Sequence, residues 1–255
     1  MKNINKKTIQ SVDRALSILE QFSISDKEIG LSELSKRTGL KRTTCYGLAE
    51  TLLIREYLGF NEDNSKYRLG IKTLAIGQVF SESLDLRKIA RPFIQKLADK
   101  YQQTLHLVIP NKFDAIYIDK VGENETFRVR SGIGTTAERF CTGVSKVLTS
   151  TLGDEELSLA LSDPLKRFTA NTIVDCDTYK EELKKVREQG YAQDNEELEI
   201  GLSCVAAPIY DHNHKVIAAI SMSGPTQLMK SNSKPVIENI KDTANQITKQ
   251  LRGSI

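Results

Sequence analysis

The chain has 255 residues and a mass of 28.6 kDa, which suits one or two domains with a core that needs no disulfides or metals. Apolar residues make up 39% and charged residues 27%, and no run approaches the roughly 20 apolar residues of a membrane helix. Four scattered cysteines without a CxxC pair argue against a structural zinc site and a disulfide framework, and the polar, basic start lacks the apolar block of a secretory signal. We therefore expect a globular cytoplasmic protein without membrane contact.

The net charge of +3 is distributed unevenly along the chain. Residues 1–80 contain 13 Lys or Arg and 9 Asp or Glu, a balance of +4, which leaves 23 and 24 for residues 81–255, a balance of −1. A small basic segment on a near-neutral body predicts a polyanionic partner for the N-terminal third alone.

The N-terminal third has the pattern of a helix-turn-helix. Apolar residues at helical spacing predict a first helix over residues 12–22, with Ser11 as its N-cap. The polar stretch 26–30 predicts a turn before a short second helix over residues 31–37. Gly39 follows and precedes a third helix over residues 42–54, because glycine accepts the positive φ of such a turn without strain.

Two short aromatic-rich runs, residues 56–60 and 66–70, flank the turn-forming cluster 61–65 and predict a hairpin. Helices and hairpin in this order make a winged helix-turn-helix, whose third helix enters the major groove of DNA. The candidate DNA-binding residues are those on the outer face of the third helix and the basic residues around it: Lys41, Arg42, Thr43, Thr44, Tyr46, Glu50, Lys66 and Arg68. The basic residues among them would contact phosphates, which fixes register without reading sequence.

The remaining two thirds alternate predicted helices and strands. The strands are expected over residues 104–110, 113–121, 127–131, 191–196, 204–210 and 216–223. The helices are expected over residues 71–79, 84–101, 143–152, 154–162, 179–189 and 234–251. Strands able to pair antiparallel, with helices segregated around them, predict an α+β fold. We expect a DNA-binding domain over residues 8–70, a linker helix over 71–83 and a sensor domain over 84–255.

Polar residues on three of these strands could form a pocket. Ser221 and Ser223 share one face of a strand, because side chains repeat every second residue. Cys204 lies near the start of the neighbouring strand and Asp194 in the strand before it. Gly143 and Val144 open a helix whose free N–H groups suit an anion, so a small carboxylate is a plausible ligand. The alternative is structural, with the hydroxyls bonded within a packed strand and Cys204 a core residue.

Six segments spread over residues 10–252 carry a family resemblance: SVDRALSILE at 11–20, GLKRTTCY at 39–46, KYRLG at 66–70, DNEE at 194–197, GLSCVAAPI at 201–209 and AAISMSGP at 218–225. In them the chain resembles the IclR family of bacterial transcription regulators. The resemblance implies a GAF- or PAS-like α+β effector-binding domain and a dimer, often assembled further into tetramers. It nominates as effector-binding residues Gly143, Val144, Asp194, Cys204, Ser221 and Ser223. Gly47 departs from the family, which usually has a basic residue there, and so does Lys41, where a small N-cap residue is more usual.

We therefore expect a regulator without enzymatic activity and without a cofactor. Its affinity for a pseudo-palindromic double-stranded DNA operator would change when a small carboxylate binds the second domain. A sugar acid, a 2-oxo acid and an aromatic acid all fit. We expect a repressor, although the sign of the regulation depends on where the operator lies. A homodimer or a dimer of dimers is expected, because two half-sites give a small winged helix its specificity.

Two alternatives concern the second domain. The first is a Cys-nucleophile enzyme, in which Cys141 or Cys204 would attack and a histidine would act as base, although no catalytic sequence motif appears. The second is a metal- or redox-sensing regulator, whose candidate zinc ligands are Asp211, His212, His214 and either Cys204 or Cys176. A DNA architectural protein with no effector is disfavoured, because DNA binding requires only the first third of the chain.

Overall fold

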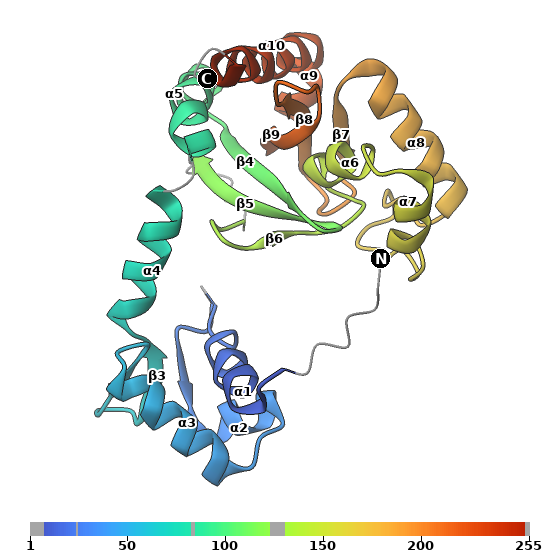
Figure 1. Cartoon of the computed structure of the whole chain (residues 1–255). Helices are drawn as coiled ribbons and strands as arrows, with labels where there is room; N and C mark the ends of the chain where they lie inside the picture. The colour runs from blue at the N-terminus through green and yellow to red at the C-terminus, as the bar shows by residue number, and fades with distance from the viewer. Residues whose placement is uncertain (1–7, 24, 83–84, 123–130, 253–255) are drawn as a thin grey trace. The chain divides into compact units, whose positions relative to one another are not determined.

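The computed structural model describes residues 8–23, 25–82, 85–122 and 131–252. The chain divides into two compact units, one that ends by residue 84 and one that begins at Asp85 (Figure 1). Within the described residues, no helix is both long enough and apolar enough to cross a membrane.

The first unit is a winged helix-turn-helix, as predicted. Its elements are α1 (Gln10–Leu19), β1 (Glu28–Gly30), α2 (Leu31–Thr38), α3 (Arg42–Ile54), β2 (Leu58–Asn61), β3 (Lys66–Leu69) and α4 (Ile71–Glu82). The strands form an antiparallel sheet in the order β1-β3-β2, and Gly39 ends α2 at a φ of +68°. Ile18, Leu34 and Ala49, one from each of the first three helices, pack with Tyr67 of the wing in a single core.

Three local predictions in this unit were wrong. Ser11 is not an N-cap, because α1 begins at Gln10, with Ile9 at the cap position and no side-chain cap. The helix also ends at Leu19, and Phe22 packs against the core from the turn that follows. Residues 28–30 form strand β1 rather than a turn, because their backbone groups pair with those of β3. The amino-acid sequence of these three residues shows no strand alternation, so it did not predict the strand.

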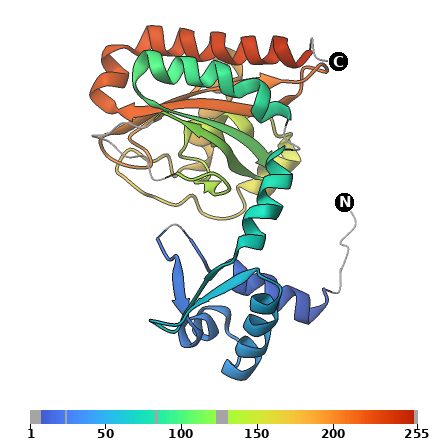
Figure 2. The ribbon, with the colours of Figure 1, turned by 90° about the vertical axis from the view of Figure 1, so that its left-hand side faces the viewer.

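The second unit is an α+β domain, as predicted. Six strands form one antiparallel sheet in the order β6-β5-β4-β9-β8-β7. They are β4 (Thr104–Asn111), β5 (Asp114–Val121), β6 (Thr136–Ala137), β7 (Ala192–Asn195), β8 (Leu202–Tyr210) and β9 (Val216–Pro225). The helices are α5 (Asp85–Tyr101), α6 (Gly143–Thr149), α7 (Asp154–Ala160), α8 (Cys176–Gln189), α9 (Thr226–Ser231) and α10 (Ser233–Arg252). Helices α5 and α10 lie together on one face of the sheet, and α6 covers the other face, with α8 packed against it (Figure 2).

Several boundaries in this unit differ from the sequence prediction. Residues 127–130 of the predicted strand 127–131 lie outside the described residues, and Ser131 is not in a strand. The two-residue strand β6 and the short helix α9 were missed, since neither is long enough to show a period. Helix α8 begins three residues before the expected Tyr179, because the Asp175 carboxylate accepts the Thr178 N–H at 2.8 Å and caps it.

Candidate DNA-binding and effector sites

The outward face of α3 carries most of the predicted DNA contacts. Cys45 and Ala49 are buried against the core, which turns Arg42, Thr43 and Tyr46 toward solvent on the opposite face. Thr44 is half-buried, and exposed Lys41 occupies the N-cap position of α3 without a side-chain cap. The helix therefore presents two cations and polar side chains at its N-terminal end, the end that contacts base edges in this class of domain.

The wing adds two further cations. Lys66 and Arg68 alternate along β3 with buried Tyr67, so both side chains point away from the core. The wing turn is held by Glu28 of β1, whose two carboxylate oxygens accept the side-chain amides of Asn61 at 3.0 Å and Asn64 at 2.7 Å. Those two hydrogen bonds lower the pKa of Glu28. The role of Glu28 was not predicted, because this residue lies in a short polar run that gives no strand signal.

Glu50 differs from the other predicted DNA contacts. Its side chain is half-buried at the junction of α3 and the wing, where the Tyr67 hydroxyl donates to Glu50 Oε1 at 3.5 Å. Tyr67 in turn packs edge-on against Phe60, with ring centroids 5.0 Å apart. Glu50 therefore contacts the wing strand from the recognition helix, whereas Arg42 and Lys66 extend freely into solvent.

The predicted effector residues meet on the α6 face of the second sheet. Strand pairing places Asp194 of β7 opposite Cys204 of β8, and Cys204 opposite Ser223 of β9. Ser221 lies two residues along β9 on the same face, opposite Ala206. Since Ala206 packs in one core cluster with Val144 of α6, this face is the one that α6 covers. We refer to Asp194, Cys204, Ser221 and Ser223 as the polar rows.

Gly143 brings the first turn of α6 onto this face. A Cβ atom on Gly143 would lie 3.2 Å from the Cβ of Ala206, so the helix approaches β8 about as closely as glycine permits. Thr142 caps the helix by accepting the Ser145 N–H at 3.3 Å, a cap that leaves the Gly143 and Val144 N–H groups uncapped. The helix has only seven residues, so its dipole is weaker than the sequence argument assumed, and the Val144 side chain is a core residue.

Hydrogen bonding within the polar rows is incomplete. The Cys204 thiol donates to Ser223 Oγ at 3.0 Å, whereas no hydrogen bond from the described residues reaches the buried Ser221 side chain. Asp194 is fully buried: its Oδ1 accepts the backbone N–H of Glu197 at 2.7 Å, and its Oδ2 has no partner among the described residues. Burial raises the pKa of Asp194 from 3.8 to about 7. A buried carboxylate oxygen without a partner is expensive and needs a donor.

Two aromatic residues of this face were missed as site residues. His106 of β4 is the cross-strand partner of Ser221, and its ring lies 4.9 Å from that of Tyr117 on β5. Burial lowers the pKa of His106 to about 3, so the imidazole is neutral. Its Nε2 pairs with Ser131 Oγ at 2.6 Å, and its buried Nδ1 has no partner in the part of the chain that the structure describes. Only the alternation of β4 could have signalled its position, since the sequence suggests His106 only as one of three possible catalytic bases.

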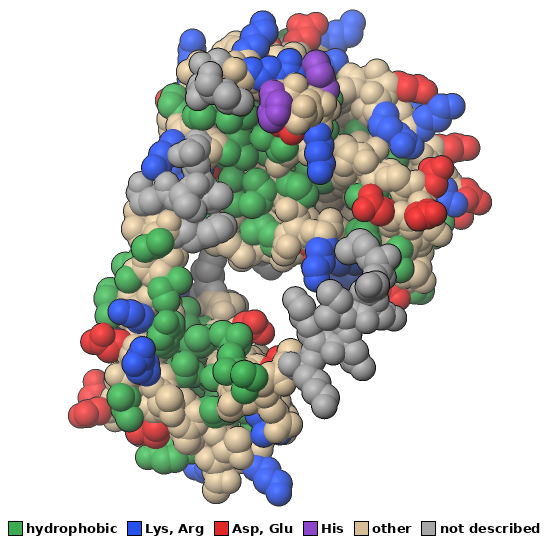
Figure 3. Space-filling view, in the orientation of Figure 1, with side chains coloured by type: hydrophobic (Ala, Val, Ile, Leu, Met, Phe, Trp, Pro, Cys, Tyr) green, Lys and Arg blue, Asp and Glu red, His purple; other side chains and the backbone are tan. Residues whose placement is uncertain are grey.

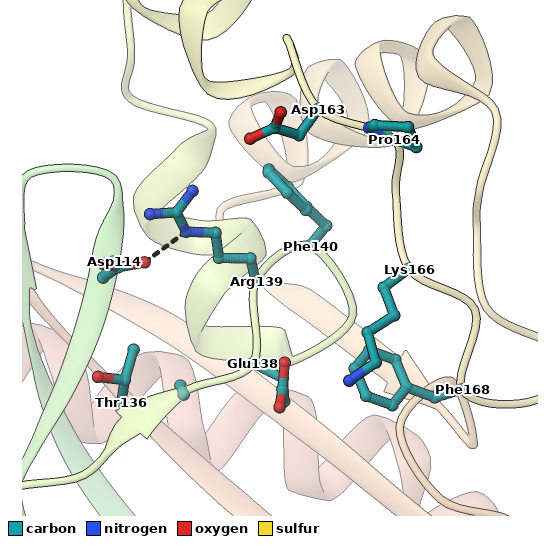
Figure 4. A pocket seen from close by; sticks show the side chains of 10 residues that line it. Asp114, Thr136, Glu138, Arg139, Phe140, Asp163, Pro164, Lys166 and Phe168 are labelled. Carbon is teal, nitrogen blue, oxygen red and sulfur yellow. Dashed lines mark hydrogen bonds and ion pairs between the residues drawn. The ribbon is translucent and has the colours of Figure 1, made fainter. Parts of the chain in front are cut away.

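A surface cavity of about 340 Å³ lies beside this region (Figure 4). It is lined by Asp114, Thr136, Ala137, Glu138, Arg139, Phe140, Asp163, Pro164, Lys166 and Phe168, and thus by none of the predicted effector residues. The Arg139 guanidinium pairs with Asp114, and the Lys166 ammonium lies 4.4 Å from the Phe168 ring centroid. The backbone carbonyl of Glu138 accepts the Ser145 hydroxyl at 2.9 Å, which joins the cavity wall to the first turn of α6.

Comparison with known families gives two matches along the chain. Residues 11–61 match the IclR helix-turn-helix domain, and residues 78–249 match the C-terminal domain described as bacterial transcriptional regulator IclR C-terminal. Together they span both structural units.

Individual relatives agree with this assignment. The chain is 37% identical over 216 residues to the HTH-type transcriptional regulator XynR of Escherichia coli K12, an alignment that covers 84% of this chain and 86% of that protein. The crystal structure of Thermotoga maritima IclR superposes with a TM-score of 0.76 at 27% identity, covering 96% of this chain and 99% of that one. An IclR homologue from Microbacterium hydrocarbonoxydans, solved with 4-hydroxybenzoate, shares the fold with a TM-score of 0.86 at 21% identity, covering 95% and 99%.

Proposed function

The chain belongs to the IclR family of bacterial transcriptional regulators, and from that premise we propose which of its residues bind DNA and which bind an effector. It is a DNA-binding regulator with a C-terminal effector-binding domain. Residues 8–70 would contact the operator, residues 71–83 would form the linker helix, and residues 84–255 would bind the effector in the cytoplasm. The regulator itself would catalyse no reaction.

The DNA contacts would come from the outer face of α3 and from the wing. Arg42 at the start of α3 and Arg68 on β3 are exposed, and neither is in a salt bridge with another described residue. Free guanidinium groups on these two elements suit phosphates on either side of a major groove. Thr43 and Tyr46 would face base edges, whereas Glu50 would support the wing through Tyr67.

A homodimer, or a dimer of dimers, would read two half-sites about 34 Å apart. Exposed apolar side chains along α4 support self-association: Ile71 and Leu74 are each 66% exposed and Val79 is 73% exposed. Hydrophobic side chains gather over this helix in Figure 3. Several exposed apolar side chains on one helix are typical of a surface covered in an assembly.

The effector would be a small carboxylate held on the polar rows beneath α6. The observation that carries this proposal is Asp194 Oδ2, which is buried without a partner among the described residues, on the same face as the buried Ser221 side chain, which no hydrogen bond from those residues reaches. A ligand carboxylate would accept from Ser221 and from the free N–H groups of Gly143 and Val144, while a ligand hydroxyl would donate to Asp194 Oδ2. Both orphaned groups would then be satisfied at once.

Specific contacts weigh against the two alternatives. Burial raises the pKa of the Cys141 thiol to about 12 and raises that of Cys204 as well, so neither is a reactive thiolate near neutral pH. In the β8–β9 turn, Asp211 Oδ1 accepts backbone N–H groups of Asn213 and Lys215, and His214 contacts Arg252. The candidate zinc ligands are therefore engaged in turn contacts, whereas Cys204 lies within the sheet.

A thermal-shift screen of the full chain against D-gluconate, pyruvate and 4-hydroxybenzoate tests the effector proposal. An acid present at 100 times its Kd should add about 2.7 kcal/mol of stability. The same acid should change operator affinity in a fluorescence-anisotropy titration, and operator DNA should change the affinity for the acid by the same factor.

Ser221→Ala should abolish both the thermal shift and the change in operator affinity. Ser150→Ala, which removes a buried hydroxyl bonded locally to Val147 O, is the matched control. Equal responses of the two variants would refute the assigned site.

A further inference from the structure

Lys146 is the only Lys or Arg that is fully buried among the residues the structure describes, with 1% of its surface exposed. It lies on α6, one turn after Gly143, the residue by which that helix rests on β8. Removing an ammonium group from water costs several kcal/mol unless its donors are satisfied. The contacts that satisfy Lys146 therefore indicate what it holds in place.

Two of its partners flank Asp194 in the chain. The Lys146 ammonium donates to the backbone carbonyl of Gln193 at 2.9 Å, just before Asp194, and to Glu197 Oε1 at 2.5 Å, three residues after it. The backbone N–H of Glu197 is the group that binds Asp194 Oδ1. A third partner, Glu182 of α8, is more distant at 3.4 Å and partly exposed.

We propose that Lys146 is a positioning residue of the effector site, which fixes the Asp194 carboxylate relative to the first turn of α6. The ammonium clamps the chain on both sides of Asp194 and belongs to the same helix as Gly143 and Val144. One side chain therefore sets the separation between the two walls of the proposed site. This inference rests on the effector site proposed above.

Stability alone does not require such an ion pair. A methionine has a similar volume and fills the same space without a desolvation penalty, and buried ion pairs replaced by apolar residues often leave a protein equally stable or more stable. The segment after Asp194 also has neutral anchors, since the Glu197 carbonyl accepts the Thr172 hydroxyl at 2.6 Å. Thr172 contacts this segment from the loop before α8, whereas Lys146 contacts it from α6.

Hydrogen exchange of the full chain, measured without any ligand, tests the clamp. Lys146→Met alone would leave the Glu197 carboxylate buried without its counter-ion. The informative variant is therefore the double substitution Lys146→Met/Glu197→Gln, which removes both charges. We expect the Glu197 amide to exchange at least tenfold faster than in the wild type, while amides near Ile240 in α10 keep their rates. Glu182→Gln, which removes only the distant partner, should stay within twofold of the wild type.

Suppose that the α10 amides of the double variant exchange at wild-type rates and the amide of residue 197 does too. That result would show that Asp194 is held without Lys146. Faster exchange throughout the chain would make Lys146 a general stability element, which also overturns the proposal. A second measurement uses whichever of the three acids stabilises the wild type: its affinity should fall at least tenfold in the double variant, and an unchanged affinity would refute positioning. If no acid binds the wild type, the carboxylate effector is refuted, and the exchange experiment still decides the clamp.

Discussion

The DNA-contacting surface and the effector face place their polar groups in opposite environments. Arg42 and Lys66 extend into water from a compact apolar core, so each acts as an independent charge. Asp194 and Ser221 lie inside the second unit, brought together by separate strands. Among the described residues Asp194 Oδ2 has no partner, and no hydrogen bond reaches the Ser221 side chain. Changes on the first surface should therefore be graded and additive, whereas changes on the second should be large and coupled.

Asp194→Ala should show the largest effect. It removes the only carboxylate of the polar rows, the acceptor proposed for a ligand hydroxyl, so the thermal shift and the change in operator affinity caused by an effector should both be lost. Operator affinity without ligand should stay within twofold of the wild type, measured by anisotropy. Loss of DNA binding as well would mean that Asp194 mainly holds the turn to Glu197 and is structural.

The pH dependence of stability should reveal the buried carboxyl of Asp194. Its pKa is about 7 in the folded chain and 3.8 when unperturbed, so the folded state binds the extra proton and stability falls as pH rises from about 4 to about 7. At about 1.4 kcal/mol per pH unit, the cost at pH 8 is at most about 4 kcal/mol.

Asp194→Asn keeps an acceptor for the Glu197 N–H but cannot ionise. It should therefore be more stable than the wild type at pH 8, and the two should converge at pH 4, as measured by urea unfolding. A constant difference across this range would show that Asp194 does not titrate there. The titratable groups that interact with residue 194 are the same in both proteins, so their contributions largely cancel in the comparison: Lys146, Glu197, Cys141, Cys204 and Tyr117.

Arg42→Ala and Arg68→Ala should have moderate effects on DNA binding. Each should weaken binding to every sequence about tenfold at low salt and reduce the slope of log K against log salt by about 0.9, because one phosphate contact is lost. Lys184→Ala on exposed α8 is the matched control and should leave the slope unchanged. A wild-type slope in both arginine variants would remove these residues from the interface, and additive effects in the double variant are expected of independent charges.

The contrast between the two surfaces also explains what the sequence could predict. The bounds of α3 follow from a local period, and the pairing of Asp194, Cys204 and Ser223 follows from strand alternation once neighbouring strands are assumed. His106 and Lys146 could not be found in this way. Their roles depend on which strand pairs with β9 and on where α6 lies over the sheet, and both are set by packing between residues far apart in the chain. Strand β1 was missed for the same reason, since only its partner β3 makes it a strand.

Substitutions at two glycines should have the smallest effects on stability, and they test the difference between the surfaces most directly. Gly47 lies inside α3, and a Cβ there would meet nothing within 4 Å. Gly47→Ala should therefore stabilise the chain by about 0.5–1 kcal/mol in urea unfolding, the usual helix-propensity gain.

Gly143→Ala makes the same chemical change in α6 but puts the new methyl group 3.2 Å from Ala206 Cβ. It should gain less stability than Gly47→Ala or lose some, and it should weaken effector binding because α6 must lift from β8. Equal gains at both positions would mean that α6 can move freely over the sheet. In that case the close approach of α6 could not fix the geometry of the site, and the effector face would be as tolerant of substitution as the DNA-contacting surface.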